Sequence, residues 1–136
     1  MRYLLGITIA TLGIFVAQAA QACSCAPPPG PKKALEGSSA VFLGKVLDID
    51  KAGRRGVKVT FEIQTVYKGV KGKKVTVGTA NNSAACGYGF TKGEVYLVYC
   101  YGKPESLSTG ICSRTRPASE AKEDLTVLGE GIAAID

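Results

Sequence analysis

Residues 95–101, with the sequence VYLVYCY, decide the fold more than any other stretch of the chain. Successive residues of a β-strand point to opposite faces of its sheet. One face would carry Val95, Leu97, Tyr99 and Tyr101, and the other would carry Tyr96, Val98 and Cys100. Because both faces are apolar, the stretch predicts a strand that is buried on both sides, either central in a sheet or lining a barrel.

Four further segments have the composition or the period of strands. The clearest begins at Val57, where apolar and polar residues alternate as far as Gln64 before the phase slips at Thr65 and Val66, which predicts a bulge. Gly44 predicts a bulge or bend inside the first predicted strand, Val41–Ile49. The other predicted strands are Val41–Ile49, Val75–Thr79 and Ser106–Ser113.

Turns and short helices separate these strands. The predicted turns are Asp50–Gly56 and Lys68–Lys74. The residues of Ala80–Gly89 are mostly small or polar, which predicts a loop. Lys32–Ser39 predicts a short helix, and Pro117 suits the first turn of a second helix that ends at Gly129. The pattern predicts a mainly β protein, a five-stranded OB-like barrel with short flanking helices. A β-sandwich fits the strand count nearly as well.

The start of the chain is typical of an export signal. Arg2 is followed by an uncharged apolar run from Leu4 to Val16, and the small residues of Ala20-Gln21-Ala22 suit a signal peptidase. We therefore expect a signal peptide over residues 1–22 and one secreted domain over residues 23–136, periplasmic if the source has an outer membrane. A lipoprotein anchored at Cys23 is the alternative. We expect no transmembrane anchor in the mature chain.

Five cysteines and no histidine limit the chemistry. The usual Ser/His and Cys/His nucleophilic sites need imidazole, so we expect no enzyme, and we expect no cofactor of the protein's own. In an oxidising compartment the cysteines should form disulfides, with one left over, but spacing alone leaves the pairing open. Reduced thiolates of Cys23 and Cys25 binding a soft metal are an alternative. Cys100 is expected to be a buried, inert thiol.

The formal net charge of +6 favours polyanionic partners. Candidate residues for such a face are Arg54, Arg55, Lys58, Lys68, Lys71, Lys73 and Lys74. A solvated edge that discourages strand-to-strand aggregation is the competing interpretation of these residues. Export makes nucleic acid an unfavoured partner.

Several short motifs follow one another in an order that points to a family. Cys23-Ser24-Cys25 with Pro27 stands at the predicted mature terminus; Ala40-Val41-Phe42, Gly44-Lys45-Val46, Cys86-Gly87-Tyr88, Tyr96-Leu97-Val98 and Cys112 follow. In these motifs the chain resembles the inhibitory amino-terminal domain of the tissue inhibitors of metalloproteinases, as a short relative that has only this domain.

The resemblance implies a barrel of the netrin-module kind and two disulfides, Cys23–Cys86 and Cys25–Cys112, which leave Cys100 free. It also implies that the backbone amine and carbonyl of Cys23 chelate the zinc of an extracellular target protease. Ser24 would enter that protease's specificity pocket. The rest of the contact surface would come from Cys25, Ala26 and the loop Ser83-Ala84-Ala85. The competing hypothesis is that the disulfides only staple the chain end, giving an extracellular binding or structural module without inhibitory activity.

Overall fold

The computed structural model describes residues 22–53 and 56–135. The predicted signal peptide, Met1–Ala22, lies outside the described residues except for Ala22. Arg54 and Arg55 of the proposed basic face also lie outside them. In the described part of the chain, no helix combines the length and the apolar character needed to cross a bilayer.

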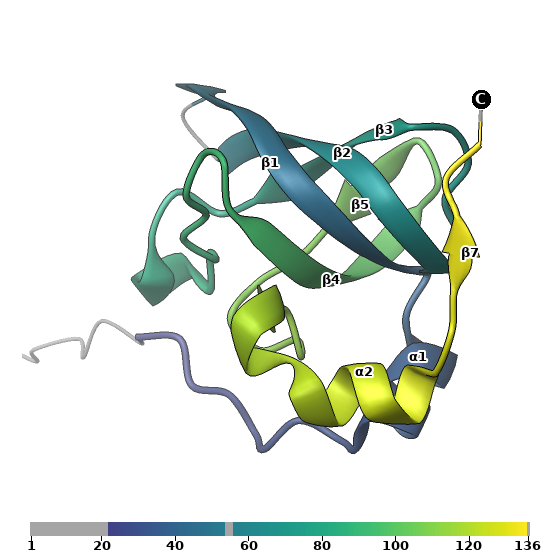
Figure 1. The fold of residues 1–136 in the computed structure, drawn as a ribbon. Helices are drawn as coiled ribbons and strands as arrows, with labels where there is room; N and C mark the ends of the chain where they lie inside the picture. Colours follow the sequence, from purple (N-terminus) through teal and green to yellow (C-terminus); the bar gives the residue numbers. More distant parts are fainter. Residues whose placement is uncertain (1–21, 54–55, 136) are drawn as a thin grey trace, which may run out of the picture.

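Five strands close into a barrel, shown in Figure 1. Its strands are β1 (Ala40–Gly53), β2 (Gly56–Lys68), β3 (Lys74–Thr79), β4 (Val95–Lys103) and β5 (Ser106–Ser108). β1 pairs antiparallel with both β2 and β4, β2 pairs with β3, and β4 pairs with β5. A single parallel bridge, Gly78 with Ser108, joins β3 to β5. The five-stranded barrel is thereby confirmed, and its closure excludes the sandwich.

The first hairpin corrects the predicted turn over Asp50–Gly56. β1 continues to Gly53 and β2 already begins at Gly56, with Asp50 opposite Lys58 and Gly53 opposite Gly56. The charged residues suggested a loop, but an exposed ribbon leaves such side chains in water while the backbone groups pair across the strands. Residues 50–53 and 56 of the predicted turn therefore belong to the two strands.

Bulges bend β1 and β2 where the sequence indicated irregularity. Leu43 pairs with Thr65 but Gly44 pairs with Ile63, which leaves Gln64 as an extra residue. A second shift leaves Tyr67 unpaired between Val66 and Lys68. The irregularity predicted at Gly44 is confirmed, and the phase slip at Thr65 and Val66 is flanked by these two bulges.

The fifth strand is shorter than the predicted Ser106–Ser113, because the chain leaves the barrel after Ser108. The N–H groups of Thr109 and Ile111 donate to the carbonyls of Gly78 and Cys86, at 2.9 and 3.0 Å. The Thr109 bond continues the contact with β3, and the Ile111 bond takes the chain across to the loop before β4. The backbone of Ile111 thus bonds to this loop instead of to a neighbouring strand.

The second helix also begins later than predicted. Pro117 belongs to the short strand β6 (Arg116–Pro117), which pairs with β4, and the 3-10 turn η2 (Ala118–Glu120) precedes helix α2 (Lys122–Leu128). Gly129, with φ of 70°, ends the helix as predicted. Helix α1 (Pro31–Gly37) begins at a proline, and β7 (Ile132–Ala133) pairs with β2.

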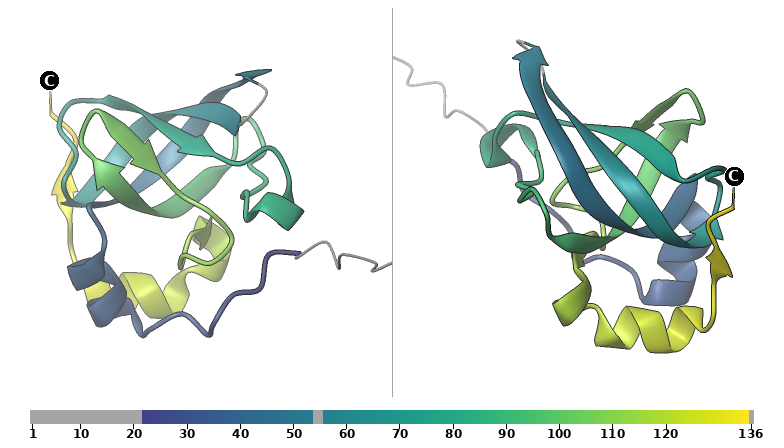
Figure 2. Two further views of the ribbon diagram at one scale, coloured as in Figure 1. Left: turned by 180° about the vertical axis from the view of Figure 1, so that it is seen from behind. Right: turned by 45° about the horizontal axis from the view of Figure 1, so that its top comes forward.

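The two helices lie side by side across one end of the barrel (Figures 1 and 2).

β4 separates two apolar layers, as its sequence predicted. Tyr96, Val98 and Cys100 pack inside the barrel with Phe42 and Phe61. Leu97 and Tyr99 face the other way, toward a cluster that contains Val41, Ala34 of α1 and Ala121 beside α2. Tyr101 is 42% exposed, because β4 leaves the core at that residue.

Candidate functional site

Two disulfides fix the amino-terminal segment to two loops at the edge of the barrel. Cys23 is bonded to Cys86, with Cα atoms 5.2 Å apart, and Cys25 to Cys112, with Cα atoms 5.1 Å apart. Both pairings implied by the family resemblance are confirmed. Cys100 is a free, buried thiol. We call residues 22–26, the loop 82–87 and Cys112 the amino-terminal corner; Figure 1 shows the start of the segment beside this loop.

The loop in this corner is a short 3-10 turn, η1 (Ser83–Ala85). The Asn82 side chain begins the turn by accepting a 2.9 Å hydrogen bond from the Ala85 N–H. This is the ordinary capping role of asparagine, which its short polar side chain makes possible. The turn ends at Cys86, which has a φ of 64° and is the only non-glycine residue with positive φ in the described chain.

Backbone contacts place the turn against the amino-terminal segment. The Cys23 N–H donates to the Ala84 carbonyl at 3.1 Å, so the nitrogen of the predicted mature terminus lies directly beside the turn. Gly87 lets the chain pass close to Ala80, since a Cβ at position 87 would overlap the Ala80 carbonyl. The corner is therefore held by covalent and backbone links.

All of the predicted contact residues except Cys23 are exposed to solvent. Cys23 is partly buried, whereas the segment and loop residues expected to meet a protease are exposed: Ser24, Cys25, Ala26, Ser83, Ala84 and Ala85. The structure brings these two stretches together, although about sixty residues separate them in the sequence. The Cys23 nitrogen links the two exposed stretches through its bond to the Ala84 carbonyl.

A buried ion pair anchors the next part of the segment. Arg114 donates to both carboxylate oxygens of Asp124, at 2.6 and 2.8 Å, and its remaining nitrogen donates to the Pro29 carbonyl at 3.1 Å. Tyr99 Oη donates to Asp124 at 2.8 Å. Asp124 is fully buried and Arg114 is only 8% exposed, so the pair is desolvated as well as bidentate.

The electrostatics of this group follow from its geometry. Burial alone would raise the pKa of Asp124, but hydrogen bonds from Arg114 and Tyr99 and the nearby positive charges outweigh burial and lower it. The pKa of Tyr99 is raised, first by burial and then by its bond to Asp124. The carboxylate is consequently the form that the fold stabilises. No local pattern in the sequence indicates this buried group, because charged residues normally lie on the surface.

The cysteine not involved in a disulfide is chemically quiet. Cys100 is fully buried on the inner face of β4, and burial raises the pKa of its thiol to about 12. A thiol must ionise to act as a nucleophile or a metal ligand. The expectation of a buried, inert thiol therefore agrees with its surroundings.

The proposed basic face is divided between different roles. Lys68 donates from Nζ to the carbonyls of Leu35 and Glu36, at 3.0 and 2.9 Å, and so caps helix α1. Lys58, Lys71 and Lys74 are exposed. One member of the proposed basic face is therefore committed to the fold.

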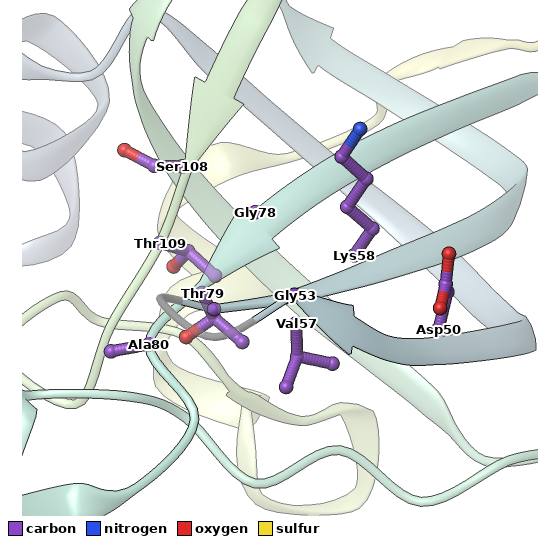
Figure 3. Close-up of a pocket in the computed structure, with 10 residues that line it drawn as sticks. Asp50, Gly53, Val57, Lys58, Gly78, Thr79, Ala80, Ser108 and Thr109 are labelled. Carbon is purple, nitrogen blue, oxygen red and sulfur yellow. The ribbon is translucent and has the colours of Figure 1, made fainter.

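A groove of about 750 Å³ lies elsewhere, at the end of the first hairpin (Figure 3). Lys58 and Asp50 border it on one side, and Thr79 and Thr109 border it on the other. The two threonine hydroxyls already serve the fold. Thr79 Oγ1 accepts from the Tyr88 N–H and Thr109 Oγ1 donates to the Tyr99 carbonyl, both at 2.8 Å. The groove therefore offers fewer uncommitted polar groups than its composition suggests.

No protein-family model matches the chain, and no curated protein matches it either. The features that indicate a function are the geometry of the amino-terminal corner and the sequence motifs that it contains.

Proposed function

We propose that this protein is a secreted inhibitor of zinc metalloendopeptidases, and that the backbone amine and carbonyl of mature Cys23 chelate the zinc of the target protease. The observation that carries the proposal is the fixed position of the Cys23 nitrogen. A disulfide holds its residue, and in the structure, where Ala22 still precedes it, the peptide N–H of Cys23 donates to the Ala84 carbonyl.

The chemistry needs only groups that this corner presents. A catalytic protease zinc has three protein ligands and one open position, which normally holds the water that attacks the substrate. An amine and the carbonyl oxygen of the same residue form a five-membered chelate that displaces this water. An uncharged amine has two N–H groups and a lone pair, so one N–H can stay bonded to Ala84 while the lone pair binds zinc.

Rigidity favours binding in this proposal. Two disulfides and the Arg114 bond to Pro29 restrict both ends of the segment that contains Cys23. An ordered segment loses less conformational entropy when it enters an active-site cleft than a free chain end would lose. The exposed residues Ser24 and Ser83–Ala85 would then supply contacts on either side of the metal, with Ser24 directed into the specificity pocket.

The test compares two forms of the protein on a panel of zinc metalloendopeptidases. One form begins at Cys23, and the other retains Ala22, which converts the amine into an amide without a usable lone pair. We expect inhibition by the extended form to be weaker by about 100-fold or more, which corresponds to about 2.7 kcal/mol. Intact mass and thermal unfolding should show both disulfides and the same stability in the two forms.

A matched variant separates the chelate from the neighbouring contacts. Ser24→Arg keeps the amine and carbonyl of Cys23 and should change which proteases are inhibited. Equal inhibition by the two chain forms would contradict chelation. A lack of inhibition by both forms would favour the competing function, a disulfide-stapled extracellular binding module.

A further inference from the structure

The two disulfides of the amino-terminal corner are in contact with each other. Cys23 Sγ and Cys112 Sγ belong to different disulfides but lie 3.6 Å apart. The sulfurs of Cys23, Cys25 and Cys112 all lie within 4.8 Å of one another. A sulfur released from one bond would therefore already be next to a sulfur of the other bond.

Solvent exposure distinguishes the two disulfides. Cys25 and Cys112 are both exposed, whereas Cys23 and Cys86 are both partly buried. Exchange requires an attacking thiolate to reach a sulfur atom, so access controls which bond reacts first. An external thiol would meet Cys25–Cys112 before Cys23–Cys86.

We propose that Cys25–Cys112 is a site of thiol–disulfide exchange with an external dithiol, and that its opening transfers Cys23 from Cys86 to Cys112. The exchange is a property of the sulfur cluster alone. Its consequence for protease binding rests on the proposed function, because the loop that Cys86 tethers is part of the proposed contact surface.

The exchange proceeds in two stages, and atoms and electrons balance in each. A thiolate of the external dithiol attacks Cys25 Sγ and releases Cys112 as a thiolate; the second thiol of the dithiol then displaces Cys25. The dithiol becomes a disulfide, and the protein gains two electrons and two protons. In the second stage the Cys112 thiolate attacks Cys23 Sγ, a Cys23–Cys112 bond forms, the Cys23–Cys86 bond breaks, and Cys86 leaves as a thiolate. This stage involves no net oxidation or reduction.

The position of Cys86 favours its departure. Its φ of 64° lies in the left-handed region, which residues other than glycine adopt at an energetic cost. The disulfide is one of the constraints that hold Cys86 there, together with its backbone bond to Ser83. Once released, the residue can relax, and η1 keeps only the Asn82 cap and its backbone bonds. Protease binding should weaken because the loop is no longer fixed beside Cys23.

Cys25→Ser provides the direct test, because it frees Cys112 without any reductant. The mature variant is held at pH 8, quenched with acid, alkylated and mapped by mass spectrometry. We expect at least about a tenth of the molecules to contain Cys23–Cys112 with a free Cys86. Cys112→Ser is the matched control: it frees Cys25, whose exchange with Cys23 would close a very short ring, so Cys23–Cys86 should persist. Cys23–Cys86 as the sole bridge in Cys25→Ser would overturn the proposal.

The wild-type protein gives a second test if Cys25→Ser fails to fold. Limited treatment with dithiothreitol, followed by the same acid quench and mapping, should reveal Cys23–Cys112 with free Cys25 and Cys86. Retention of Cys23–Cys86 with free Cys25 and Cys112 would overturn the transfer. These maps are scored without a protease, so they remain decisive even if the mature chain inhibits none. If it does inhibit, the exchanged form should be weaker by about tenfold or more.

Discussion

Two regions of this protein use cysteine in opposite ways. Inside the barrel, Cys100 is fully buried among apolar side chains and acts as a small hydrophobic residue. At the amino-terminal corner, Cys23, Cys25, Cys86 and Cys112 link an extended segment to two loops. Side-chain packing among the strands stabilises the barrel, whereas the corner depends on two disulfides and a few hydrogen bonds. The difference suggests that the corner can be altered chemically while the barrel remains folded.

The Arg114–Asp124 pair connects these two regions, and breaking it should have the largest effect. Asp124→Ala leaves a buried guanidinium without its bidentate partner, so we expect the free energy of unfolding to fall by about 3–5 kcal/mol in urea titrations. Glu123→Gln is the control. Glu123 also meets Arg114, at 3.2 Å, but is 70% exposed, so its loss should cost less than about 1 kcal/mol. Similar values for the two variants would show that burial of the pair contributes little.

Removing the Cys23–Cys86 bridge should affect the corner more than the barrel. Replacing both residues by serine should lower the free energy of unfolding by up to about 4 kcal/mol, because the bridge closes a long loop. The amine and carbonyl of residue 23 remain, but their orientation is no longer fixed, so we expect inhibition to weaken by about tenfold or more. Circular dichroism should still report the barrel. Unchanged inhibition would mean that the bridge does not position the terminus.

Acid should weaken the link between barrel and corner. The folded-state pKa of Asp124 lies below its unfolded value, so the carboxylate stabilises the fold fully above the unfolded pKa of about 4. This contribution is lost as the pH falls through the lower folded pKa. Urea titrations between pH 6 and about pH 2 should show the loss, and Asp124→Asn should show a smaller loss over the same range. Identical profiles would assign the acid sensitivity to other groups.

Cys100 should give the smallest effect. Cys100→Ala removes one buried sulfur, and we expect a cost of about 1 kcal/mol with inhibition unchanged. Because burial raises the pKa of the thiol to about 12, iodoacetamide should not modify Cys100 in the folded protein near neutral pH. Rapid modification under native conditions would contradict a closed barrel interior.

The sequence predicted the barrel better than the parts that position the site. Strand periodicity identified β2 and both apolar faces of β4, and the family motifs implied both disulfides. From composition, the turn of the first hairpin and the end of β5 were predicted wrongly, because cross-strand pairing and loop contacts override local preference there.

Local sequence patterns could not predict the group around Asp124. Arg114 and Asp124 are polar residues on separate elements, and only the packing of α2 against the barrel buries them together with Tyr99. The contact between the Cys23 and Cys112 sulfurs is likewise a product of tertiary structure. A family resemblance can imply which cysteines pair, but it says little about whether two disulfides touch.

The central claim, chelation by Cys23, is tested most directly at the metal. Cobalt(II) replaces zinc in a protease from the panel, and its visible absorption bands report the number and kind of ligands. We predict that adding the mature chain changes these bands to those of a five-coordinate ion with a new nitrogen ligand, while the Ala22-extended form leaves them unchanged. Inhibition by the mature chain with an unaltered cobalt spectrum would contradict the claim.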